Sequence, residues 1–308
     1  MMERRTLVRS LPLLGFGAAT LASCQQEKVT LEASVCEPTL SGQAPEIDLF
    51  YIDKGKGDPL LFIPGFTLSS DVFVHQVNAF AEHYRVIVID PRSHGKSPMT
   101  LEGNNYPQHG ADLHNLIECL DLRDITIVGW SFGALSAWSY AEQFGTDRLR
   151  TFVAIDMPPV PLSGNEGADI WVEAPVSSLS EAYHILANRE GQAESMRDYA
   201  QSIMVQRDLT ESELQEIVSW SLKTPPVIAQ ALFASGFFSD YLEIAKKIDI
   251  QLPSLMVVGD YWADTALPYL SRELPNTDVS VLGWHMMFWE HHEQFNKLLL
   301  SWLGAQEK

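Results

Sequence analysis

The sequence predicts an α/β protein: a doubly wound, mostly parallel sheet with a helical insertion that caps it. Short apolar runs rich in β-branched residues alternate with segments of helical spacing, first up to about residue 156 and again from about residue 252. This alternation is typical of a parallel sheet with helices on both faces. Residues 157–251 break the rhythm with a proline cluster and then amphipathic segments without a convincing strand. We therefore predict a core of residues 46–156 and 252–305 and a cap of residues 157–251.

Length and charge fit one such domain and exclude some partners. The chain has 308 residues, 46% of them hydrophobic, which is enough for a sizeable buried core. Its 40 acidic residues outnumber 21 basic ones and leave a net charge of −19. This charge repels phosphate backbones, so we expect no nucleic-acid partner.

The first 24 residues have the pattern of an export signal. Arg4, Arg5 and Arg9 precede an apolar run that is too short to span a bilayer comfortably. The run ends at Leu21-Ala22-Ser23-Cys24, which resembles a bacterial lipobox, whose cysteine is lipidated. The resemblance implies an exported protein of the cell envelope, anchored through a lipid on Cys24, with residues 25–45 as a tether. An uncleaved anchor or a misassigned start codon are the alternatives, and export by either the twin-arginine or the general route is compatible with Arg4 and Arg5.

Two cysteines remain after Cys24. Cys119 falls within a helical apolar pattern, which favours a buried, inert thiol. An oxidising envelope compartment would permit a bond between Cys36 and Cys119 instead.

The elements of the core follow one another in a regular order. We expect an edge hairpin over residues 46–57, strands at 59–66, 85–90, 124–128, 151–156, 255–259 and 279–282, and helices at 71–83, 112–122, 132–144 and 290–303.

The stretch Gly129-Trp130-Ser131-Phe132-Gly133 lies where a predicted strand passes into a predicted helix. Glycines at both ends of the pentapeptide let strand and helix pack closely, and the tight turn between them exposes the serine hydroxyl. Ser131 is therefore the candidate nucleophile. An ordinary glycine-flanked turn is the alternative.

With this turn placed, the chain resembles the α/β-hydrolase superfamily, especially its cofactor-free haloperoxidase and esterase branch. Four further stretches carry the resemblance in family order: Phe62-Ile-Pro-Gly-Phe66, Asp90-Pro-Arg-Ser-His-Gly-Lys-Ser97, the segment from Ile248 to Gly259, and Gly283-Trp-His-Met-Met-Phe-Trp-Glu290. The resemblance implies the fold firmly and the substrate hardly at all, because this superfamily hosts many chemistries.

A serine hydroxyl needs a base to take its proton and a third group to hold that base. His285 matches the family's base, because it lies between the last predicted strand and the closing helix. The acid departs from the pattern, since Trp262 occupies the usual Gly-x-x-Asp position. Asp156, at the end of the strand after the nucleophile helix, is the favoured acid, with Asp264 and then Asp260 as alternatives.

The resemblance also implies an oxyanion hole and a substrate pocket. The backbone amides of Phe66 and Phe132 match the two positions that would stabilise the oxyanion. Trp130, Trp262 and Trp284 could line an apolar pocket, together with Met286 and Met287 if the insertion closes over it; for Trp130, packing in the core is an equal alternative.

The leading hypothesis is a serine hydrolase that cleaves a carboxylic ester or related acyl bond of a small-molecule substrate through an acyl-enzyme intermediate. The alternatives are a cofactor-free haloperoxidase or perhydrolase and a non-catalytic binding protein with the same fold. Haloalkane dehalogenation is disfavoured, because that chemistry needs aspartate where this chain has Ser131. No cofactor or metal is expected, since the chain has no dinucleotide-binding glycine motif, no phosphate-binding loop and no His-Glu-x-x-His.

Overall fold

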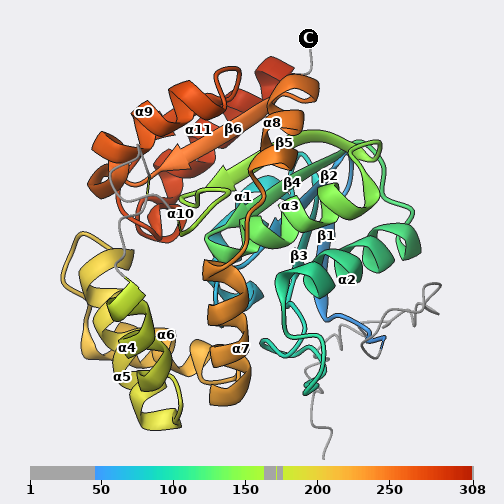
Figure 1. Ribbon diagram of the computed structural model, residues 1–308. Helices are drawn as coiled ribbons and strands as arrows, with labels where there is room; N and C mark the ends of the chain where they lie inside the picture. The colour runs from blue at the N-terminus through green and yellow to red at the C-terminus, as the bar shows by residue number, and fades with distance from the viewer. Residues whose placement is uncertain (1–45, 163–170, 172–175, 307–308) are drawn as a thin grey trace, which may run out of the picture. The chain divides into compact units, whose positions relative to one another are not determined.

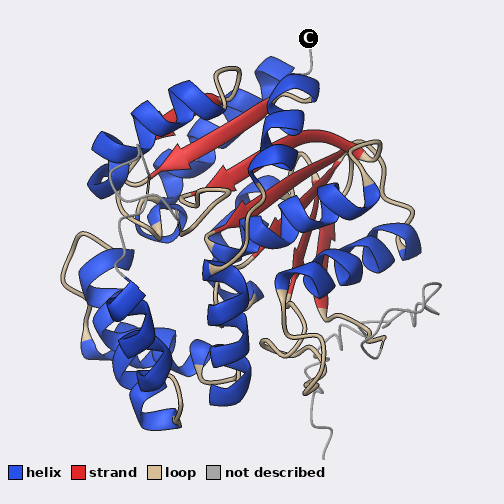
Figure 2. Cartoon of the chain, in the orientation of Figure 1, coloured by secondary structure: helices blue, strands red, loops and turns tan. Residues whose placement is uncertain are grey.

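The computed structural model describes residues 46–162, 171 and 176–306 of the chain (Figure 1). A sheet of seven strands in the order β1-β3-β2-β4-β5-β6-β7 forms its centre, with helices on both faces (Figure 2). The expected signal sequence, Cys24, Cys36 and the tether lie outside the described residues. No helix in the described ranges is long and apolar enough to cross a bilayer.

The strands are β1 (Tyr51–Gly55), β2 (Pro59–Ile63), β3 (Arg85–Ile89), β4 (Ile125–Trp130), β5 (Leu149–Ile155), β6 (Ser254–Val258) and β7 (Asp278–Val281). All neighbouring strands are parallel except β1 and β3. Every residue of β4 and β6 is buried, as their continuous apolar runs predict for strands covered on both faces. The α/β class with a mostly parallel sheet is confirmed.

The expected edge hairpin is wrong. Strand β1 runs antiparallel to β3, with Tyr51 opposite Ile89, although β2 follows β1 directly in the chain. Strand β2 lies between β3 and β4, so the Lys54-Gly-Lys-Gly57 turn joins two strands that do not pair.

The helices and single turns of the core are η1 (Ser70–Phe73), α1 (Val74–Phe80), α2 (Tyr106–Cys119), α3 (Phe132–Phe144), α8 (Leu242–Gln251), η3 (Asp260–Trp262), α9 (Ala263–Glu273), α10 (Met287–Glu290) and α11 (His292–Gln306). Helix α2 begins six residues before the predicted start, because Asn105 caps it by accepting a hydrogen bond from the Gln108 amide. Helix α9 was not predicted, and it contains Pro268.

The apolar side chains form two clusters, one on each face of the sheet. The first cluster joins the sheet to α2, α3, α8 and α9. The second joins it to α1 and α11 and continues into the insertion through Met196 and Ile217. The two faces thus hold the carboxyl ends of β4, β5 and β6 at a fixed spacing.

The insertion is helical where it is described: α4 (Val176–Ile185), α5 (Arg189–Tyr199), the π-turn η2 (Ala200–Met204), α6 (Glu211–Ser221) and α7 (Pro226–Phe237). Helix α8, which the sequence assigned to the insertion, contributes Ile244 and Ile248 to the core cluster that contains α3. Helix α7 contributes Ile228 and Leu232 to the same cluster, so the last two helices of the predicted insertion both pack on the core.

The expectation for Cys119 as a buried, inert thiol is wrong. Its side chain lies on the exposed side of the last turn of α2 and takes part in a disulfide bond. The helical apolar pattern around Cys119 belongs to Leu113, Leu116 and Ile117, which face the core.

Candidate active site

Ser131 lies on a strained turn between β4 and α3. Its backbone has φ 51° and ψ −133°, a conformation that costs a non-glycine residue of the order of 1–3 kcal/mol. Added β-carbons at Gly129 and Gly133 would come within 2.5 Å of Ala134 Cα and 2.4 Å of the Ile63 carbonyl oxygen. These glycines therefore allow the close approach of strand and helix that the pentapeptide predicts, and Ser131 stands between them.

His285 and Asp156 form a buried pair close to this turn. The His285 ring donates from Nδ1 to Asp156 Oδ2 over 2.7 Å, and the two side chains are 2% and 0% exposed. Asp156 directly follows β5, the strand beside β4 in the sheet, and it also has a positive φ of 54°. With Nδ1 bonded to the carboxylate, Nε2 is left as the nitrogen able to accept a proton.

The two alternative acids lie elsewhere. Asp264 is exposed in the first turn of α9. Asp260 is also exposed, and its carboxylate accepts a hydrogen bond from the Gln206 side chain over 3.1 Å. Of the three carboxylates that the sequence offered, the structure brings Asp156 to His285.

A tyrosine that the sequence analysis missed completes the surroundings of Asp156. The Tyr261 hydroxyl donates to Asp156 Oδ2 over 2.7 Å, and the Gly259 amide donates to Oδ1 over the same distance. Burial and the nearby carboxylate raise the pKa of Tyr261 far above its ordinary value, so this hydroxyl keeps its proton. Asp156 thus accepts three hydrogen bonds, which compensate for the burial of its charge.

Backbone contacts fix the loop that carries His285. The Trp130 indole, next to Ser131, donates to the His285 carbonyl oxygen over 2.8 Å, and the two rings lie 5.4 Å apart. From the cap, the carbonyls of Ile203 and Met204 accept from the amides of His285 and Met286. Ser131 and His285 are therefore held on adjoining segments, although the Ser131 hydroxyl forms no hydrogen bond with the described part of the chain. Such bonds often tighten only when substrate binds.

The amides expected to form the oxyanion hole flank the same turn. Phe132 is the first residue of α3, where a helix leaves its amides without an intrahelical acceptor. A β-carbon added at Gly65, just before Phe66, would come within 3.0 Å of Ser131 Cβ. Neither the Phe66 nor the Phe132 amide bonds to another described residue. Both donors therefore remain free beside Ser131.

Aromatic rings from the core and from α7 meet next to these amides. Phe132 packs edge-on against Phe66 and Phe237, and Phe233 lies between the latter two. A β-carbon added at Gly236 would come within 2.4 Å of the Phe132 ring, so α7 lies directly on it. The sequence analysis missed Phe233 and Phe237, because nothing in the sequence indicates which face of α7 meets the core.

The three tryptophans differ in their burial and in the residues that they contact. Trp262 lies half-buried with its ring 6.1 Å from His285, and Trp284 packs against Tyr261. Trp130 is only 1% exposed and packs among core aromatics, so its place as a pocket residue is wrong. Met286 and Met287 are likewise fully buried in the core.

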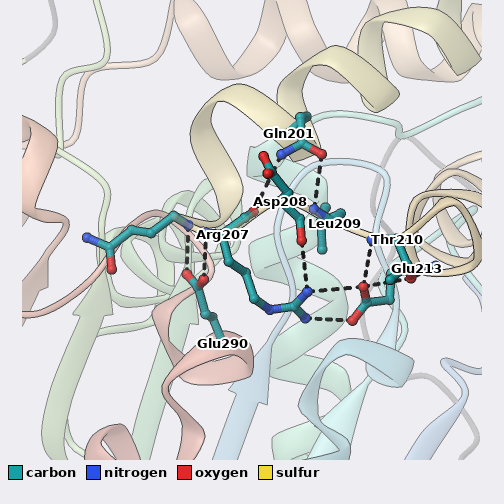
Figure 3. Close-up of polar contacts among 8 residues, drawn as sticks. Gln201, Arg207, Asp208, Leu209, Thr210, Glu213 and Glu290 are labelled. Atoms are coloured by element: carbon teal, nitrogen blue, oxygen red, sulfur yellow. Dashed lines mark hydrogen bonds and ion pairs between the residues drawn. The ribbon is translucent and has the colours of Figure 1, made fainter.

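The cap is bound to the core by a charged network (Figure 3). Glu290, at the end of α10, accepts from the backbone amides of Gln206 and Arg207 over 2.8 and 3.0 Å. The Arg207 guanidinium in turn binds both carboxylate oxygens of Glu213, which also caps α6 at Thr210. The amide contacts fall two and three residues after Met204, so Glu290 holds the same cap segment that bonds to the His285 loop.

Four of the other histidines make contacts away from Ser131. The buried ring of His94 bonds to the Arg92 carbonyl oxygen over 2.7 Å, and burial lowers the pKa of His94 to about 4. His292 stacks on His75, and His291 bonds to the Gln206 side chain. Across residues 46–162 and 176–306, no group of three or more acidic, histidine or cysteine side chains could hold a metal ion.

Comparisons with known proteins agree with this fold. A family described as alpha/beta hydrolase fold matches residues 58–203. A non-heme chloroperoxidase of Kitasatospora aureofaciens is 28% identical over 84% of this chain and 96% of its own length. The solved structure of a bromoperoxidase from Bacillus anthracis superposes with a TM-score of 0.76 and 26% identity, covering 85% of this chain and 97% of the other. An esterase from Exiguobacterium antarcticum has a TM-score of 0.70 at 19% identity, over 84% and 96% of the two chains, and supports the fold alone.

The fold and the comparisons define the class: the protein is a hydrolase-type enzyme with the α/β-hydrolase fold. More particularly, the chain is similar to non-heme haloperoxidases over most of its length, and the alpha/beta hydrolase family matches its residues 58–203.

Proposed function

We propose that the protein is a serine hydrolase that cleaves a carboxylic ester or a related acyl bond. The single observation that carries the proposal is the buried His285–Asp156 pair next to the strained turn of Ser131. A carboxylate behind a histidine, and a serine on a turn of this kind, are what acyl transfer requires of a protein without a cofactor.

The reaction would run in two halves. The Ser131 hydroxyl attacks the ester carbonyl while His285 Nε2 takes its proton, and Asp156 stabilises the resulting imidazolium without accepting a proton itself. The amides of Phe66 and Phe132 stabilise the negative oxygen of the tetrahedral intermediate. His285 then gives its proton to the departing alcohol, which leaves an acyl group on Ser131.

Water completes the cycle. His285 removes a proton from a water molecule, which attacks the acyl carbonyl, and collapse of the second intermediate returns the proton to Ser131 and releases a carboxylic acid. The aromatic rings of Phe66, Phe132, Phe233 and Phe237 would receive an apolar part of the substrate.

Turnover of p-nitrophenyl esters of increasing chain length tests this function and the depth of the pocket together. We expect hydrolysis by the purified protein and its loss in Ser131→Ala. Hydrolysis at an undiminished rate in Ser131→Ala would refute the mechanism.

A second function draws on a different observation, the likeness to a chloroperoxidase over 84% of the chain. In cofactor-free perhydrolysis, the same acyl-enzyme reacts with hydrogen peroxide in place of water and releases a peracid, which oxidises halide. Peroxide-dependent halogenation in the presence of acetate, measured beside ester hydrolysis, separates the two functions. Both would be lost in Ser131→Ala.

We also propose that the protein is exported and anchored by a lipid on Cys24. The disulfide bond at Cys119 supports an oxidising compartment, since such bonds are rare in the cytosol. Metabolic labelling with a radioactive fatty acid, which should be lost in Cys24→Ala, tests the anchor.

A further inference from the structure

The loop after β6 carries a polar contact that acyl transfer by Ser131, His285 and Asp156 does not itself require. Tyr261 lies in η3, between the two carboxylates that the sequence offered as alternative acids. Its hydroxyl reaches back to Asp156 Oδ2 over 2.7 Å and lies 3.3 Å from His285 Nδ1. One phenol therefore contacts both members of the buried pair.

The chain makes room for this contact. A β-carbon added at Gly259 would come within 2.6 Å of the Tyr261 ring and 3.2 Å of Asp156 Oδ2. The Gly259 amide meanwhile bonds to Asp156 Oδ1. The turn after β6 thus places the Gly259 amide and the Tyr261 hydroxyl so that each donates a hydrogen bond to one oxygen of Asp156.

We propose that Tyr261 is a positioning residue that sets how strongly Asp156 holds His285, and thereby the pH range in which His285 can act as a base. The proposal rests on the proposed serine hydrolase function. A hydrogen bond donated to Oδ2 draws negative charge away from the oxygen that faces His285 Nδ1, so the imidazolium form is stabilised less.

Besides His285 itself, Tyr261 is the donor to Asp156 Oδ2 in the described part of the chain. Among the described residues, the titratable side chains that face His285 are Asp156 after β5, Tyr261 in η3 and Tyr199 in α5, whose ring lies 5.6 Å away. Burial raises the pKa of Tyr199 as well as that of Tyr261, so neither phenol ionises in the working range. Trp130 and Trp262, the other rings against His285, carry no titratable group.

The pH profile of kcat/KM for a p-nitrophenyl ester tests the proposal. In Tyr261→Phe we expect the acid limb to move to higher pH by about half a unit or more, the size expected from losing one hydrogen bond to a charged acceptor. Site-specific 3-fluorotyrosine at position 261 is a more acidic, stronger donor, and we expect it to move the same limb to lower pH. A loss of packing alone would not give shifts of opposite sign.

Tyr269→Phe is the matched control. Its hydroxyl is buried in α9 without a hydrogen-bond partner in the described part of the chain, so its removal should leave the acid limb in place. An acid limb that stays within a tenth of a unit of the wild-type position in both Tyr261 variants would overturn the proposal. If Tyr261→Phe fails to fold, the fluorotyrosine protein decides by the same criterion.

A wild-type protein that hydrolyses no ester would instead count against the proposed function. The proposal then keeps its own readout, the low-field proton resonance of the His285 Nδ1–H···Asp156 hydrogen bond. This resonance should move in the two Tyr261 variants, in opposite directions, and an unchanged resonance would overturn the proposal independently of activity.

Discussion

Replacing Asp156 by asparagine changes one atom of the buried pair and reverses the direction of its hydrogen bond. The Gly259 amide is a fixed donor on Oδ1, so the asparagine oxygen must take that place and the amide nitrogen must take the place of Oδ2. There it faces His285 Nδ1 at the position of the present 2.7 Å contact. The asparagine NH2 group and His285 Nδ1–H would both be donors in this contact, so His285 must accept through Nδ1 and carry its ring proton on Nε2.

A histidine protonated on Nε2 cannot take the proton of Ser131. We expect kcat for ester hydrolysis to fall by about 10⁴-fold, the cost that the wrong tautomer has in a triad of this kind, which corresponds to about 5 kcal/mol in activation free energy. KM should change little, because Asp156 is fully buried and presents no surface to a substrate.

Steady-state kinetics of Asp156→Asn beside Asp264→Asn is the assay. Asp264 is exposed on α9, so the same change there should leave kcat within a factor of two or so. The thermal midpoint of both variants verifies folding. If folded Asp156→Asn retained kcat within tenfold of the wild type, Asp156 would not be the group that orients His285.

Three further changes follow from the structure. In Gly65→Ala the new β-carbon would press on Ser131 Cβ and the Trp130 ring, so kcat should fall about 10- to 100-fold while the urea midpoint hardly moves, and full activity would contradict the tight fit of this loop. In Glu290→Gln one of the two amides of residues 206 and 207 loses its acceptor, so the free energy of unfolding should fall by about 2 kcal/mol in urea titrations; an unchanged midpoint would mean that Glu290 does not hold the cap. Burial lowers the pKa of His94 from 6.5 to about 4, so on acidification the unfolded chain binds this proton before the folded protein does. The contribution of neutral His94 to the free energy of unfolding is therefore complete above pH 6.5 and is lost as the pH falls towards 4. The loss is about 3 kcal/mol at most. His94→Gln should therefore show a flatter dependence of unfolding free energy on pH over this window, and an identical slope would contradict it.

Local patterns predicted the nucleophile turn well, because everything that shapes it lies within a few residues. The apolar run of β4, the two glycines and the helix from Phe132 to Phe144 are contiguous in the chain, and the structure has that helix with the predicted bounds. The acid depended on the order of the strands instead. Asp156 binds His285 because β5 lies between β4 and β6 in the sheet, and no local sequence pattern reveals this strand order.

The residues that the sequence missed are those whose roles arise from long-range packing. Tyr261 is an ordinary loop tyrosine until the turn after β6 brings it against Asp156. Phe233 and Phe237 occupy a helix that is apolar on nearly all sides, and its contact with the core depends on Gly236 fitting over Phe132. The sequence did indicate that the loop after β6 is unusual, because Trp262 occupies the position where relatives carry the acid. It did not indicate that Tyr261 of this loop contacts Asp156.

The central claim is that Ser131 is the residue that becomes acylated, with His285 as its base. Mass spectrometry of peptides from the full protein, after reaction with a fluorophosphonate that traps activated serines, tests it most directly. We predict an adduct on the peptide that contains Ser131, formed rapidly in the wild type and very slowly in His285→Ala. An adduct on a different residue, or equal labelling rates in the two proteins, would contradict the claim.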